Sequence, residues 1–138
     1  ETAKTREFGY PLSLALLNMD RYDSFEQSAG MKESLLLHVL KKIKGNVKDF
    51  DIIGEIDDST IAILLPGQTI DKAQMWGERV RKDIASAIAD IDEKRLTVTI
   101  SIGLAQANSY DKADTLSRNA QSALRLASEK TNAVVVFS

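Results

Sequence analysis

A short polar turn between two β-rich runs, near the middle of the chain, constrains the fold most. Residues 50–56 and 60–65 are rich in isoleucine and leucine, and only the segment Asp57-Asp58-Ser59 separates them. Two such runs joined by so short a segment are typical of a β-hairpin, and a Pro-Gly pair ends the second run. The fold must therefore contain an antiparallel strand pair, with further elements before and after it in the chain.

Apolar periodicity predicts the elements around this hairpin. The nearly continuous apolar run at 12–17 is typical of a strand buried on both faces, and alternating apolar residues predict another strand at 96–105. In chain order we expect strand 12–17, helix 31–44, strands 50–56 and 60–65, helix 70–88, strand 96–105, helix 112–128 and strand 133–137. This order predicts an α/β fold, an α+β sandwich with a central mixed sheet of about five strands and helices packed on it.

The longest predicted helix, 70–88, has a clear apolar stripe. The residues of this stripe recur at helical spacing and are expected to be buried: Ala73, Gly77, Val80, Ile84 and Ile88. Trp76 lies beside the stripe, where packing explains it better than ligand stacking. The charged residues of the same helix are expected to form a solvated face: Glu78, Arg79, Arg81, Lys82 and Asp83.

Composition excludes several classes of function. A chain of 138 residues is expected to form one domain, 1–138, and its first residue, Glu1, indicates a piece of a larger multidomain protein. The net charge of -2 gives no attraction to nucleic acid or to anionic membranes, and no apolar stretch is long enough for direct membrane insertion. With no cysteine and one histidine, His38, a thiolate or histidine metal site is not expected. We expect a cytoplasmic domain, or the cytoplasmic part of a membrane-anchored protein.

Five stretches, in order and spanning most of the chain, carry a family resemblance. The stretch Leu17-Asn18-Met19-Asp20-Arg21-Tyr22 is similar to an Asp-x-Asp-x-Phe pattern, and Val98 to Ala105 is similar to a strand that contains Val-Ser-Ile-Gly. The other three are Gly9 to Leu12, Ile61 to Gly67 and Ala120 to Leu124. Together they resemble the GGDEF domain family of diguanylate cyclases. The resemblance implies the palm-like fold of nucleotide cyclases and polymerases.

The resemblance also implies a chemistry. The family joins two GTP molecules into cyclic di-GMP between two facing domains, with Mg²⁺ bridging phosphates. Carboxylates hold such an ion, and the glycines of the signature turn let the backbone approach the triphosphate. By the same resemblance, the two signature glycines correspond to Asp57 and Asp58, the acidic third position to Ser59, the metal-binding glutamate to Thr60, and the closing phenylalanine to Ile61. The turn is therefore expected to be degenerate.

The remaining family positions point the same way. The second metal carboxylate corresponds to Asn18, so both metal ligands, Asn18 and Thr60, are expected to be lost. The guanine-contacting asparagine and aspartate of the family correspond to Glu26 and Leu35. Its phosphate-binding lysine and arginine correspond to Ser128 and Asn132. None of these positions keeps the family's chemistry. We therefore expect no metal, no cofactor and no catalytic residue.

Two alternatives remain open at this point. Asp20 matches the family's second aspartate and could gather a divalent ion with Asp57 and Asp58. Lys48 and Asp51 match the ends of an Arg-x-x-Asp motif with which family members bind cyclic di-GMP, but lysine lacks the planar fork of arginine.

The sequence therefore predicts a non-catalytic domain with a regulatory or protein-interaction role in a bacterial cyclic di-GMP signalling protein. Its expected partners are another protein or neighbouring domains of the same chain, and not nucleic acid. A receptor for cyclic di-GMP or a guanine nucleotide is the alternative, and an active diguanylate cyclase is a further one. Lys41, Lys42 and Lys44 form a basic cluster near a helix C-terminus, where cations are favoured in any case.

Overall fold

The computed structural model describes residues 11–21, 29–48, 51–55, 60–91, 93–107 and 113–137. Within these ranges three helices and seven strands follow one another along the chain. They are β1 (Leu12–Met19), α2 (Ala29–Lys44), β2 (Ile52–Glu55), β3 (Thr60–Pro66), α3 (Ile70–Ser86), β4 (Ala89–Ile91), β5 (Lys94–Leu96), β6 (Ile100–Gln106), α4 (Ala113–Lys130) and β7 (Val134–Val136).

Five of the strands form one mixed sheet, in the order β2-β3-β1-β6-β7. The pairs β1–β3, β1–β6 and β2–β3 are antiparallel, whereas β6 and β7 are parallel. The predicted hairpin strands pair as β2 and β3, while the turn between them, 56–59, lies outside the described residues. The predicted α/β fold with a five-stranded mixed sheet is confirmed.

Strand β1 lies at the centre of this sheet and is buried on both faces. Ala15, Leu17 and Met19 belong to one hydrophobic core, and Leu14 and Leu16 belong to the other. This explains the continuous apolar run, because neither face of a central strand between two helix layers reaches water. Strand β3 instead alternates between buried and half-buried residues, since only one of its faces is fully covered.

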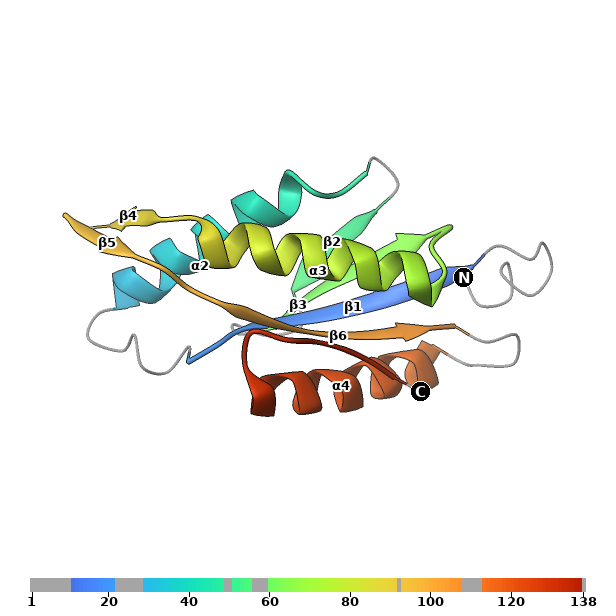
Figure 1. Ribbon diagram of the computed structural model, residues 1–138. Helices are drawn as coiled ribbons and strands as arrows, with labels where there is room; N and C mark the ends of the chain where they lie inside the picture. The colour runs from blue at the N-terminus through green and yellow to red at the C-terminus, as the bar shows by residue number, and fades with distance from the viewer. Residues whose placement is uncertain are drawn as a thin grey trace.

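The helices form a layer on each face of the sheet (Figure 1). Helices α2 and α3 cover one face and supply Leu35, Val39, Val80 and Ile84 to what we call the α2/α3 core. Helix α4 covers the opposite face, and its residues Leu116, Ala120 and Leu124 belong to the α4 core. The molecule is thus a three-layer sandwich with β1 shared between two cores.

Helix α4 approaches the sheet unusually closely at Gly103 of β6. A Cβ atom added to Gly103 would clash with the backbone of Leu124 and would lie 2.6 Å from the carbonyl oxygen of Ala120. Real Cβ atoms do not come this close to backbone, so only glycine fits here. The Ser-Ile-Gly sequence of β6 therefore sets the distance between α4 and the sheet.

The main difference from the predicted elements lies between α3 and β6. Helix α3 ends at Ser86 rather than at residue 88, and Ile88, predicted to lie on the buried stripe, is 49% exposed. The chain then forms a small separate hairpin, β4–β5, which the sequence did not predict, and a break at 97–99 separates β5 from β6. The buried Ala89 and the half-buried Ile91 point inward on either side of the exposed Asp90, a period of two that a helix cannot satisfy.

Candidate functional site

The two positions that the resemblance assigns to metal ligands lie side by side. Asn18 and Thr60 are directly opposite each other in the β1–β3 pair, at the end of β1 and the start of β3. The Thr60 hydroxyl donates a hydrogen bond of 2.8 Å to the Asn18 side-chain oxygen. The fold therefore brings these side chains together as it would a ligand pair.

The chemistry of this pair does not fit a magnesium ion. An amide and a hydroxyl are both neutral, and the amide oxygen already accepts the bond from Thr60. Mg²⁺ in proteins is held through one or two carboxylates together with phosphate oxygens and water. Within the described ranges, no group of three or more His, Asp or Glu side chains is arranged to hold a metal ion.

Asp20, two residues beyond Asn18, has its carboxylate engaged inside the protein. It is 8% exposed and accepts hydrogen bonds from the Thr99 and Ser101 hydroxyls, each of 2.6 Å. The backbone N–H of Asn132 donates a third bond of 2.7 Å, and the backbone N–H of Asp20 itself donates to the Thr99 carbonyl. These contacts tie the end of β1 to the chain before and within β6 and to the turn after α4.

The Asp20 contacts also explain an unusual backbone. Thr131 and Asn132 have φ values of 60° and 48°, in the left-handed region that residues other than glycine seldom adopt. The bond from the Asn132 N–H to Asp20 fixes this turn, which leads from α4 into β7. Asp20 therefore holds the end of β1 against the turn that leads into β7. This structural role accounts for an aspartate at this position without a metal ion.

Other positions to which the resemblance assigns a family role lie in the protein interior. Ile61 and Leu35 belong to the α2/α3 core, with exposed fractions of 3% and 0%. The Ser128 hydroxyl is buried and has no hydrogen-bond partner among the described residues. Asp57, Asp58, Ser59 and Glu26 lie outside the described residues.

Arg81 on α3 is a residue whose role the sequence did not reveal. Its side chain is 17% exposed, so the prediction that it belongs to a solvated face was wrong. It donates two hydrogen bonds to Glu78, one turn earlier, and another of 3.1 Å to the side-chain oxygen of Asn132. The bond from Arg81 lowers the pKa of Glu78, and so does the positive charge of Arg81. The spacing of Glu78 and Arg81 could have indicated the first contact, but nothing local points to Asn132.

Lys48 and Asp51 are hydrogen-bonded to each other just before β2. The backbone N–H of Lys48 donates to the Asp51 carboxylate (2.8 Å), and the backbone N–H of Asp51 donates to the Lys48 carbonyl (3.0 Å). One carboxylate oxygen of Asp51 is thus already bonded to backbone, as is common for aspartate.

Trp76 packs as predicted. Its ring is 2% exposed, and its indole N–H donates to the backbone carbonyl of Asn46, just past the end of α2. The Asn46 side chain also accepts from Arg79 and donates to Asp83. Trp76 and Asn46 therefore join α2 to α3, and this is a structural connection rather than a ligand site.

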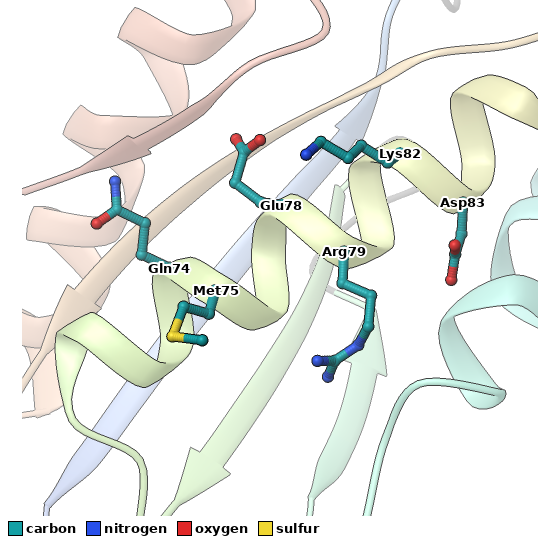
Figure 2. A pocket seen from close by; sticks show the side chains of 6 residues that line it. All are labelled: Gln74, Met75, Glu78, Arg79, Lys82 and Asp83. Atoms are coloured by element: carbon teal, nitrogen blue, oxygen red, sulfur yellow. The ribbon is translucent and has the colours of Figure 1, made fainter.

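Two hollows on the surface of the described residues are lined by residues other than Asn18 and Thr60. The first lies on the outer side of α3, where six mostly charged or polar side chains project from the helix, as Figure 2 shows. The second lies between α2 and the segment 88–91. No helix in the described part of the chain has the length and apolar content to cross a bilayer.

Comparison with known proteins identifies the family. The family model described as "Diguanylate cyclase, GGDEF domain" matches residues 1–133. The uncharacterised Bacillus subtilis protein YhcK is 28% identical over 108 residues, which cover 76% of this chain and 30% of YhcK. The chain therefore spans less than a third of the length of this curated relative.

Solved structures share the fold at low sequence identity. The GGDEF domain of Caulobacter crescentus DgcB, solved with c-di-GMP, has a TM-score of 0.91 and 17% identity, covering 97% of this chain and 82% of that one. The Pseudomonas aeruginosa FimX GGDEF domain has a TM-score of 0.87 and 20% identity (98% and 86% covered). The active GGEEF domain of a Vibrio cholerae diguanylate cyclase has a TM-score of 0.89 and 16% identity (99% and 88% covered).

Proposed function

The chain belongs to the GGDEF domain family of cyclic di-GMP signalling, and on that premise we propose that it is a non-catalytic member. In this proposal the domain acts as a regulatory and protein-interaction module of a bacterial signalling protein. Its partners are another protein or neighbouring domains of its own polypeptide. It uses no metal and no cofactor.

The Asn18–Thr60 hydrogen bond is the observation that carries the proposal. Transfer of a nucleotidyl group from GTP needs positive charge to offset the charge that develops on the phosphates. A divalent ion supplies that charge only where carboxylates hold it, and here the two matching positions are neutral and bonded to each other. Asp20, the nearest acidic side chain along β1, is directed into its own network of hydrogen bonds.

A turnover assay tests the proposal directly. The purified chain is incubated with GTP and either Mg²⁺ or Mn²⁺, and the products are separated by chromatography. The Vibrio cholerae GGEEF domain, an active relative of the same fold, is the positive control. We expect no cyclic di-GMP from this chain. Turnover that disappears in Asp20→Ala or Asp57→Ala would overturn the proposal.

The Lys48–Asp51 pair favours an interaction module over a receptor for cyclic di-GMP. Asp51 already accepts a bond from the backbone N–H of Lys48, and the Lys48 side chain offers a single ammonium rather than a planar fork. Calorimetric titration with cyclic di-GMP and with GTP distinguishes the two functions. A dissociation constant below ~10 μM that Asp51→Ala weakens would support the receptor instead.

A further inference from the structure

A groove between α2 and β4 is the surface feature that the proposed function leaves unexplained. We call it the α2–β4 groove. It is lined by Ser34, Leu37, His38 and Lys41 of α2 and by residues 88–91, and its volume is about 490 Å³. The α2 residues of the lining are spaced by three or four positions, so they form one stripe along the helix. A groove along a helix axis is suited to a second helix.

The groove exposes aliphatic side chains from both of its walls. Leu37 of α2 is 60% exposed, and Ile88 on the opposite wall is 49% exposed. Both are among the most exposed large apolar residues of the described chain. Single exposed aliphatic residues are common, but two that face one concave surface indicate a docking site.

One end of the groove is positively charged. Lys41 lines it, and Lys42 and Lys44 follow in the last turn of α2. None of the ion pairs between described residues involves these lysines. The pKa of His38, which lines the groove, is lowered first by burial and then by the positive charges of Lys42 and Lys41.

No acidic side chain among the described lining residues is placed to pair with these lysines. Asp90, on the opposite wall, lies 3.7 Å from the Arg95 guanidinium of the neighbouring strand. The α2 stripe that lines the groove contains no carboxylate. Among the described lining residues Asp90 is the only acidic one, so a second copy of this surface would bring its own basic end and one carboxylate that lies beside Arg95.

We propose that the α2–β4 groove binds an acidic amphipathic helix of a partner protein. Aliphatic side chains at one-turn intervals would pack between Leu37 and Ile88, and carboxylates in the following turn would meet Lys41 and Lys44. This inference rests on the proposed function, because it gives the interaction module its binding surface and the chemistry of its partner.

A designed peptide tests the proposal. The probe is a fluorescein-labelled helix of about 16 residues with leucine at one-turn intervals and glutamate in its last turns, long enough to follow the stripe of α2. We expect the chain to bind it with a dissociation constant below ~100 μM, measured by fluorescence anisotropy. Leu37→Ser and Lys41→Glu should each weaken binding roughly tenfold or more. A probe with lysine in place of glutamate should bind Lys41→Glu better than the wild type.

Matched variants on α3 provide the control. Met75→Ser and Lys82→Glu change an exposed apolar residue and an exposed lysine on a different surface, and they should leave binding unchanged. The proposal is overturned by lack of binding to the wild type, or by equal loss in the α3 variants. Sedimentation that shows self-association abolished by Leu37→Ser would assign the groove to a second copy instead. Because this assay contains no GTP, its failure is distinguishable from that of the non-catalytic function.

Discussion

At the scale of single residues, the contact between Asn18 and Thr60 joins two strand ends at the positions that the resemblance assigns to metal ligands. Two carboxylates at these adjacent positions would repel each other unless an ion lay between them. An amide and a hydroxyl attract each other without any ion, through the 2.8 Å hydrogen bond. The amide and the hydroxyl thus form a matched pair, and changing either one alone would remove the bond.

Placing a carboxylate at both positions should make the stability of the domain depend on magnesium. In the double variant Asn18→Asp/Thr60→Glu, two negative charges replace a hydrogen bond at the paired strand ends. We expect a loss of unfolding free energy on the order of 2–4 kcal/mol without metal, largely recovered in millimolar Mg²⁺. Thermal unfolding with and without Mg²⁺ measures this. A wild-type melting temperature that itself rises with Mg²⁺ would contradict our interpretation of the pair.

Asp20→Asn should destabilise the domain although it preserves the shape of the side chain. An amide keeps only one of the two oxygens that now accept bonds from the Thr99 and Ser101 hydroxyls and from the Asn132 backbone, and it carries no charge. Bonds to a charged carboxylate are replaced by weaker neutral ones, and we expect a cost of about 2 kcal/mol. Denaturant unfolding measures it, with Asp90→Asn as the control. The Asp90 side chain is 77% exposed, so that change should remain within about 0.5 kcal/mol.

At the scale of elements, periodicity predicted what depends on local burial and missed what depends on distant contacts. The two-sided burial of β1 and the hairpin strands β2 and β3 follow from neighbouring residues. The early end of α3 does not follow from neighbouring residues, because it depends on the burial of Ala89, beyond the helix, in the α2/α3 core. The contacts of Asp20 with Ser101 and Asn132 span 81 and 112 positions of the chain, beyond the reach of any local pattern.

Gly103→Ala should separate α4 from the sheet. The added methyl group would overlap the backbone of Leu124, and backbone cannot move aside as a flexible side chain can. We expect a loss of about 3 kcal/mol in unfolding free energy. Gly54→Ala on the edge strand β2 is the matched control, since a Cβ there meets no atom within 4 Å. Equal stability of the two variants would show that α4 is held less closely than described.

At the scale of the whole molecule, the sharing of β1 between two cores should make unfolding a single transition. The α2/α3 core contains Trp76, the only tryptophan of the chain, and the α4 core lies on the opposite face of β1. Neither core can lose β1 without exposing the other. Because both hydrophobic layers depend on one strand, we expect them to be lost together.

Leu124→Ala, a change in the α4 core, tests this cooperativity. Removing a side chain that is 7% exposed should cost about 2–4 kcal/mol. The fluorescence of Trp76, on the other face of the sheet, should report the full shift, at the same denaturant concentration as circular dichroism. Transitions that separate in the two signals would show that the layers unfold independently.

The hydrogen bond between Thr60 and Asn18 also affects the range of pH and ionic strength over which these strand ends stay paired. Neither an amide nor an alcohol gains or loses a proton in the range where proteins fold, and neither attracts a counterion. The ends of these two strands should therefore stay joined through changes in acidity and ionic strength that would loosen a metal-bridged pair.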